Sequence, residues 1–183
     1  MDDGGQRHHA SGDTVAVRQD AWLSAMVMVG QNVISGTPEG LFQPEKSVTR
    51  AEFVKMAAEA FRYKATGAMS VFTDVSDYSW YYEDAAALYG NGVVEGFGDG
   101  KLGPDERMAR GQMAVIIYRI MLDQGITTDT ARNYTPFAGY AYKAIQALYE
   151  RGIINGTGDN NCLPKSYATE AQVAAILHRV TED

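Results

Sequence analysis

The sequence predicts an all-α fold made of three helix-loop-helix repeats in a pseudo-threefold arrangement. A proline recurs at a constant step of 60 residues, as Pro44, Pro104 and Pro164. Each proline ends a glycine-rich loop and precedes a segment with apolar residues at i, i+3, i+4 and i+7, the spacing of an amphipathic helix. Self-similarity at a fixed period is the signature of repeat architectures, so we expect three copies of one structural unit.

The repeats divide the chain into four parts. Residues 1–12 form a polar, glycine-rich lead-in without the apolar stretch of a signal peptide. Residues 13–64, 65–124 and 125–183 are repeats 1, 2 and 3, with linkers at 64–77 and 124–136. Because two helices alone cannot bury both of their faces, each repeat needs its neighbours. We therefore expect one composite domain with clefts between successive repeats, and such clefts are natural ligand sites.

The first helix of each repeat is expected at 20–29, 80–89 and 139–149. An aromatic residue occupies the same register position in each, as Trp22, Tyr82 and Tyr142. Rings at such positions pack with one face and present an edge or a polar tip to solvent.

The second helix of each repeat has the clearest pattern. Its apolar residues form one stripe, which is expected to pack in the core, with the three stripe-bearing helices as a central bundle. The stripes are Phe53, Met56, Ala57 and Ala60 in repeat 1, Met113, Ile116, Ile117 and Ile120 in repeat 2, and Val173, Ile176, Leu177 and Val180 in repeat 3.

The loop between the two helices contains a Val/Ile pair and several glycines. The glycines permit tight turns, and the pairs are expected to make short extended contacts. Phe42, Leu102 and Cys162 share one register position in this loop. Cys162 is therefore interpreted as a small buried apolar residue and not as a catalytic thiol.

The start of the second helix is the most informative segment. Thr49 and Glu52 have the spacing of a capping box, Thr169 repeats the cap, and repeat 2 has Ala109 there without the hydroxyl. Arg50 and Arg110 follow at the first helical position, where a cation opposes the helix dipole. Helix amides beside a guanidinium can receive a carboxylate or phosphate. The alternative is that each arginine reaches solvent or pairs with a nearby acid.

The region from about residue 13 to 182 resembles a triplet of S-layer homology domains. Repeat 2 fits best, and repeat 1 contributes the most characteristic tetrapeptide of the family. The matching segments are Phe72-Thr73-Asp74-Val75, Trp80-Tyr81, Gly92-Val93-Val94-Glu95-Gly96, Gly98-Asp99-Gly100-Lys101-Leu102-Gly103-Pro104 and Thr49-Arg50-Ala51-Glu52. The combination over three units is specific, whereas each segment alone is not.

The resemblance implies a non-enzymatic, extracellular cell-wall anchor of a Gram-positive surface protein. Its ligand would be an acidic secondary cell-wall polysaccharide with pyruvate ketals, its fold a spindle around a central three-helix bundle, and other surface-layer subunits its further partners. Carried over to this sequence, Arg50 and Arg110 face the anionic sugar. The remaining implied ligand-binding residues are Gly36, Gly96 and Asp99 along the grooves, with Trp22 and Tyr82 as stacking platforms.

The sequence also departs from the family pattern. Glu170 stands where the arginine would be in repeat 3, and a carboxylate there would repel an anionic sugar. Gly111 and Ala109 weaken the motif in repeat 2 but leave Arg110. We therefore expect one or two competent grooves.

Composition and motif content exclude several other functions. A net charge of −7 argues against binding nucleic acid or anionic membranes through overall charge, and no apolar run is long enough to insert in a membrane. No cofactor, zinc or catalytic motif is present, and an EF-hand interpretation of residues 95–106 fails because Phe97 occupies a ligand position. The alternative function is a helical-repeat protein-protein interaction module of a surface layer.

Overall fold

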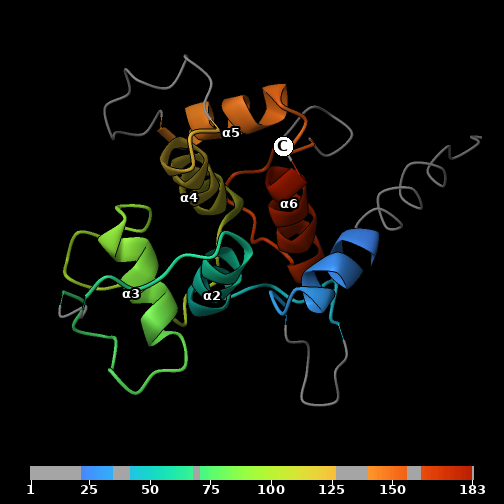
Figure 1. The fold of residues 1–183 in the computed structure, drawn as a ribbon. Helices are drawn as coiled ribbons and strands as arrows, with labels where there is room; N and C mark the ends of the chain where they lie inside the picture. The colour runs from blue at the N-terminus through green and yellow to red at the C-terminus, as the bar shows by residue number, and fades with distance from the viewer. Residues whose placement is uncertain (1–21, 35–41, 68–70, 127–139, 156–161, 183) are drawn as a thin grey trace, which may run out of the picture.

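The computed structural model describes residues 22–34, 42–67, 71–126, 140–155 and 162–182. Residues 22–30 are helical and are followed by α2 (Arg50–Ala60), α3 (Tyr82–Gly90), α4 (Arg110–Asp123), α5 (Tyr140–Glu150) and α6 (Glu170–Glu182) (Figure 1). The described residues form no β-strand. Their only β-type pairing is a set of three isolated bridges between repeats. The expected all-α class is confirmed.

Left-handed residues end the first helix of each repeat. Asn32, Gly92 and Gly152 have φ values of 61°, 69° and 70°, the conformation in which a helix commonly stops. The Val/Ile pair that follows donates its backbone N–H groups to a carbonyl of the helix it has just left, as Val93 and Val94 do to Leu88 at 2.9 and 3.2 Å. The pairs are buried, so they fasten each loop to its helix and do not pair as extended segments.

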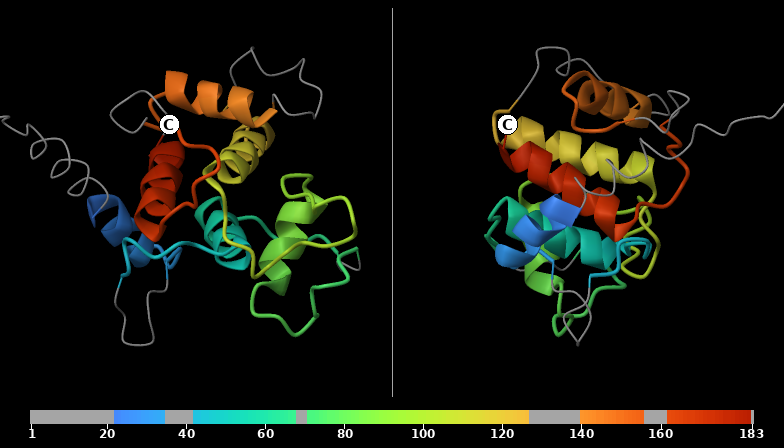
Figure 2. Two further views of the ribbon diagram at one scale, coloured as in Figure 1. Left: turned by 180° about the vertical axis from the view of Figure 1, so that it is seen from behind. Right: turned by 90° about the vertical axis from the view of Figure 1, so that its right-hand side faces the viewer.

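The apolar stripes of the second helices form the core, as the sequence predicts. Eleven stripe residues are buried and Ala60 packs partly buried against them. Helices α2, α4 and α6 gather in the middle of the molecule, and the first helices lie outside them (Figures 1 and 2). The largest fully buried side chains on the central helices are Phe53, Met113, Ile117, Ile120 and Leu177.

Each first helix packs on the second helix of the preceding repeat. Helix α3 of repeat 2 packs on α2 of repeat 1, and α5 of repeat 3 packs on α4 of repeat 2. The helix of residues 22–30 lies beside α6 in Figures 1 and 2, and Ser24 Oγ is 3.3 Å from His178 Nδ1. The two helices of one repeat therefore depend on neighbouring repeats for burial.

A ring of backbone hydrogen bonds joins the three repeats. The N–H of Val48 donates to Ala168, Ala168 to Met108, and Met108 to Val48, at 3.0, 2.8 and 2.9 Å. The isolated bridges Ser47–Thr169, Thr49–Arg107 and Ala109–Tyr167 lie at the same junctions. This closed cycle supports the pseudo-threefold arrangement, although the complete spindle stays a prediction.

Candidate ligand-binding site

The caps fix where the central helices begin. Thr49 N–H donates to Glu52 Oε2 at 2.8 Å and Glu52 N–H donates to Thr49 Oγ1 at 3.3 Å, which completes the predicted capping box. Thr169 and Gln172 repeat it in α6. In α4 only one of the two bonds is present, from Ala109 N–H to Gln112 Oε1 at 3.1 Å. These contacts place Arg50 and Arg110 at the first helical positions, as expected.

The amides at these helix starts are not available to a ligand. Arg50 and Ala51 donate their N–H groups to the carbonyls of Glu106 and Pro104 in the next repeat, at 2.8 and 3.0 Å. Arg110 donates in the same way to Ser166 of repeat 3. The prediction that helix amides form an anion receptor is therefore wrong, because closing the ring of repeats uses those donors. An anion near Arg50 or Arg110 therefore cannot use these helix-start amides.

Gly111 shows how closely the repeats approach at the start of α4. Its N–H donates to the carbonyl of Pro164 at 2.9 Å, and a Cβ there would lie 3.1 Å from that carbonyl oxygen. Ala51 and Ala171 occupy the equivalent positions in the other repeats. The departure of repeat 2 from the family motif therefore lies at a tight inter-repeat contact.

Arg50 is buried in the groove between repeats 1 and 2. Only 6% of the residue is exposed. One guanidinium nitrogen, Nη2, donates to the carbonyl of Glu95 at 2.6 Å, and the guanidinium carbon lies 5.0 Å from the centre of the Phe97 ring. The buried Nε of Arg50 has no hydrogen-bond partner within the described part of the chain. Burial, and then the like charge of Arg119, lower the pKa of Arg50.

A cavity of about 200 Å³ opens beside this guanidinium. Arg50 enters it from repeat 1, and the other wall comes from the loop and α4 of repeat 2. Its lining consists of Arg50, Glu95, Gly96, Phe97, Gln112, Val115, Ile116 and Arg119. Arg119 Nη2 lies 2.8 Å from Glu95 Oε2. The cavity thus places two guanidinium groups next to apolar surface, an arrangement suited to an anion that also carries an apolar group.

Gly96 lines this cavity at a point where the surrounding loop leaves no room for a side chain. A Cβ at this position would be 2.4 Å from the carbonyl oxygen of Lys101 and 2.5 Å from the Phe72 ring. Asp74 holds the same loop by accepting the N–H groups of Leu102 and Gly103, both at 2.8 Å. The loop is therefore fixed where its carbonyl at position 95 meets Arg50.

Three other predicted site residues, Asp99, Trp22 and Tyr82, do not line the cavity of Arg50. Asp99 accepts the Lys101 N–H at 3.1 Å, as a turn residue does, and Trp22 packs edge-on against Phe42 with ring centres 5.3 Å apart. Tyr82 is partly buried against the core. These three residues are also absent from the lining of a second cavity, between repeats 3 and 1, that is described below. Gly36 lies outside the described residues.

Arg110 occupies the equivalent place between repeats 2 and 3. It is 8% exposed and its Nε donates to the carbonyl of Cys162 at 2.9 Å. Burial lowers the pKa of Arg110. Cys162 itself is partly buried against the core, as interpreted from its register.

Arg179 is the second arginine of this groove. It donates to the carbonyl of Ile153 at 2.9 Å, as Arg119 donates to the carbonyl of Val93 in repeat 2. Residues 156–161 lie outside the description, so this groove is described only in part.

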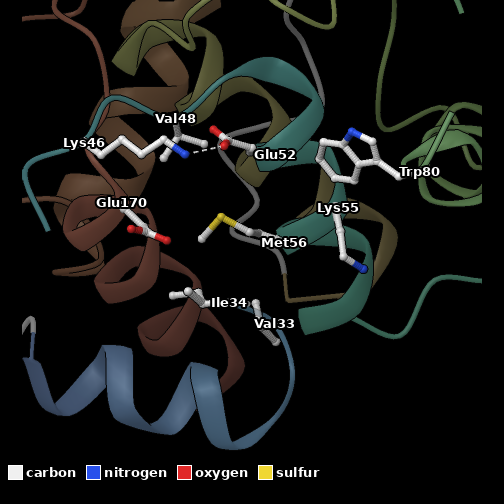
Figure 3. Close-up of a pocket in the computed structure, with 9 residues that line it drawn as sticks. All are labelled: Val33, Ile34, Lys46, Val48, Glu52, Lys55, Met56, Trp80 and Glu170. Atoms are coloured by element: carbon white, nitrogen blue, oxygen red, sulfur yellow. Dashed lines mark hydrogen bonds and ion pairs between the residues drawn. The ribbon is translucent and has the colours of Figure 1, made fainter. Parts of the chain in front are cut away.

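The third groove, between repeats 3 and 1, has the opposite charge pattern. Its cavity of about 250 Å³ is lined in part by Glu170 (Figure 3). Glu170 Oε2 accepts the N–H of Gln43 at 3.0 Å. Burial raises the pKa of Glu170, and the neighbouring charge of Glu52 adds to the rise. By the 60-residue register, Glu170 occupies the position that Arg50 and Arg110 occupy in the other two grooves. At the position equivalent to Arg119, repeat 1 has Glu59.

The lysines of the third groove are already paired. Lys46 Nζ lies 2.5 Å from Glu52 Oε1, as the dashed line in Figure 3 marks, and Lys55 lies 3.3 Å from Glu59 and 3.9 Å from Asp84. The larger of the two described cavities is therefore the less suitable one for an anion.

Arg119 and the aromatic residues at the two cavities, Phe97 and Trp80, are not among the site residues predicted from the sequence. Phe97 lines the cavity of Arg50, and the exposed Trp80 lines the third groove. Arg119 and Arg179 are related by the same 60-residue step as the prolines, whereas repeat 1 has Glu59 at that position. This recurrence of arginine at equivalent positions of repeats 2 and 3 is the sequence feature from which Arg119 could have been predicted as a site residue.

Within the described ranges the structure offers neither a set of metal ligands nor a membrane-spanning helix. No group of three or more His, Cys, Asp or Glu side chains is placed to hold a metal ion there. The helices in the same ranges are too short or too polar to cross a membrane.

Comparison with known proteins gives matches over all three repeats. The family model of the S-layer homology domain matches residues 20–54, 71–114 and 135–174. The chain is 30% identical over 173 residues to Exoglucanase XynX of Acetivibrio thermocellus, which covers 90% of this chain and 16% of that protein. It is 27% identical to a Cellulosome-anchoring protein of the same species, over 81% of this chain and 35% of that protein. It is 29% identical to the S-layer protein sap of Bacillus anthracis, over 82% and 19%. The chain therefore spans about a third or less of each of these relatives.

Proposed function

This chain belongs to the S-layer homology domain family, and we propose that it anchors a surface protein non-covalently to the bacterial cell wall. The ligand in this proposal is a pyruvylated, anionic secondary cell-wall polysaccharide that binds in the grooves between repeats. Relatives named as a cellulosome-anchoring protein and as an S-layer protein support anchoring at the cell surface. In this proposal the chain works outside the cell, as part of an exported protein.

The observation that carries this proposal is the cavity that contains Arg50 and Arg119. A pyruvate ketal has a carboxylate and a methyl group on one carbon. Two guanidinium groups match the carboxylate, and Phe97 and Val115 provide apolar surface for the methyl group and the sugar ring. A bound carboxylate would also relieve the repulsion between the two arginines, which lowers the pKa of Arg50.

The grooves are not equivalent in this proposal. The groove of Arg50 is the first candidate, and the groove of Arg110 and Arg179 is the second. The groove of Glu170 is less suited to an anionic sugar, because the carboxylates of Glu52 and Glu170 in its cavity offset its two lysines. In the groove of Arg50, two arginines face the single carboxylate of Glu95. This assignment retains the expectation of one or two competent grooves.

We propose no catalytic activity for this chain. Several relatives have the names of enzymes, such as an exoglucanase, but the chain covers only 16% of that protein. In this proposal the enzymatic activity of such relatives resides outside the matched region.

Calorimetry with purified wall polysaccharide, native and depyruvylated, tests the proposal. We expect the native polymer to bind, depyruvylation to abolish binding, and Arg119→Gln to weaken it by about tenfold or more, because a charge-assisted hydrogen bond is lost. Arg50→Lys keeps the charge but loses the planar fork and should also weaken binding. Arg62→Gln removes an exposed arginine outside both described cavities and serves as the charge-matched control. Equal binding of the depyruvylated polymer would refute the proposed ligand.

One observation favours protein contacts as a second function. Leu23, Met26 and Val27 are 60%, 69% and 39% exposed and share one face of the helix of residues 22–30. Such a face suits contact with other subunits of a surface layer. Sedimentation of the native protein and of Met26→Glu tests this, and we expect the substitution to reduce association and leave wall binding unchanged. A monomeric native protein at high concentration would argue against it.

A further inference from the structure

The cavity of Arg50 already contains a carboxylate of its own. Glu95 Oε2 lies 2.8 Å from Arg119 Nη2, in the position relative to that guanidinium that an anionic ligand would take. Glu95 also bonds to the other arginine, but through its main chain, because its carbonyl oxygen accepts the Arg50 Nη2 donor at 2.6 Å. One residue therefore holds both cations of the cavity by two separable contacts.

The two partners of the ion pair differ in their exposure. The Arg119 side chain is 19% exposed, whereas the Glu95 side chain is 67% exposed. A carboxylate in such contact with water contributes little to an ion pair and can turn away into solvent at small cost. The less exposed Arg119 would remain lining the cavity, with Arg50 across from it.

We propose that Glu95 is an internal competitor for the carboxylate of the ligand. In the unliganded groove its side chain neutralises Arg119, and an incoming anionic sugar displaces it while the Glu95 carbonyl continues to hold Arg50. A neutral sugar brings no group that replaces the lost ion pair, so the exchange favours acidic over neutral units of the polymer. This inference rests on the function proposed above.

In the groove between repeats 2 and 3, the position equivalent to Glu95 has no carboxylate. The 60-residue step places Asn155 at the position of Glu95 and Arg179 at the position of Arg119. Asn155 is exposed and neutral, so it cannot neutralise Arg179 as Glu95 neutralises Arg119. The chain thus contains one groove with an internal carboxylate and one with a neutral residue in its place. Glu95→Asn reproduces the arrangement of repeat 3 within repeat 2.

A double-mutant cycle separates competition from a general effect of charge. Calorimetry with a pyruvylated polysaccharide fragment compares native protein, Glu95→Gln, Arg119→Gln and the double variant. Glu95→Gln keeps the backbone carbonyl that holds Arg50, and we expect it to bind about two- to fivefold more tightly, the range that an exposed ion pair allows. In the Arg119→Gln background the same substitution should give no gain. Asp105→Asn, at another exposed carboxylate of repeat 2, is the control for net charge.

The outcomes distinguish the two proposals. A native protein that binds the fragment while Glu95→Gln binds no more tightly overturns the role of Glu95 and leaves the proposed function standing. An equal gain with and without Arg119, or an equal gain from Asp105→Asn, also overturns it, because the effect would be one of overall charge. Failure of both native protein and Glu95→Gln to bind the fragment overturns both proposals. Binding of the fragment by Glu95→Gln but not by the native protein would support the role of Glu95 as a competitor.

Discussion

At the scale of single residues, burial of charge distinguishes the grooves. The sequence places Arg50 where a cation opposes the dipole of its own helix. In the structure the side chain extends to the next repeat, where the carbonyl of Glu95 and the ring of Phe97 receive it. A buried charge is costly unless it is paired and hydrogen-bonded, and the buried Nε of Arg50 has no such partner among the described residues. The cost of burial at Arg50 is therefore consistent with a site that is completed by an anion.

Glu170 gives a pH-dependent prediction at this scale. Its pKa is raised in the folded protein, so the folded state binds more protons than the unfolded state above about pH 4.3, the ordinary value for glutamate. The contribution of Glu170 to folding stability therefore falls as pH rises from its ordinary pKa to its raised pKa in the folded protein. Glu170→Gln should raise the melting temperature at pH 7 and have little effect near pH 4, as measured by thermal unfolding. Exposed Glu45→Gln is the control, and a loss of stability at pH 7 in Glu170→Gln would contradict the argument.

At the scale of helices, local sequence signals decide where each element begins and ends. The box of Thr49 and Glu52 starts α2, and left-handed Gly92 ends α3. The same devices recur in the other repeats with Thr169 and Gly152. The helices therefore have well-defined ends, which position Arg50 and Arg110 in their grooves.

The missing hydroxyl at Ala109 leads to paired predictions of opposite sign. Thr49→Ala should destabilise the protein by about 1 kcal/mol, because the Glu52 N–H loses its acceptor. Ala109→Ser should stabilise it by up to about 1 kcal/mol, because α4 has the glutamine half of the box but no side-chain cap. Urea unfolding measures both. A destabilising effect of Ala109→Ser would contradict this prediction. It would indicate that the tight contact between Gly111 and Pro164 leaves no room for an added hydroxyl at the start of α4.

At the scale of the whole molecule, the repeats exchange their packing partners. Each first helix covers the second helix of the preceding repeat, and the ring of backbone bonds closes from repeat 3 to repeat 1. Helix 22–30 contacts α6 in this way, although Ser24 and His178 are 154 positions apart in the sequence. This arrangement makes the grooves shared structures, because each is built from at least two repeats.

Removing repeat 3 should therefore unfold the other two. A chain that ends after residue 124 would leave the N–H groups of Val48, Arg110 and Gly111 without their acceptors and would expose the helix at 22–30. We expect no cooperative thermal transition in its circular dichroism, whereas the intact chain should unfold in one transition. A truncated chain that melts cooperatively with native-like helicity would show that the repeats are independent.

Local sequence signals were enough to predict the helices and loops of this protein. Periodicity located all three apolar stripes, the capping spacing located the starts of α2 and α6, and the repeat register placed Arg50 and Arg110 at equivalent points. These signals are local, since helical spacing, caps and turns depend on residues a few positions apart. They were sufficient to predict an all-α repeat protein with charged grooves.

Which residues line those grooves depends on how the three repeats pack against one another. The amides at the helix starts bond to a neighbouring repeat, Arg119 enters the cavity of Arg50, and Asp99 and Trp22 lie outside the described cavities. No local pattern specifies these facts, because each depends on which repeat packs against which and on how closely their backbones approach. Burial and the distances between charges arise from that packing. The sequence therefore determined which residues could bind an anion, and the packing of the repeats decided which of them share a groove.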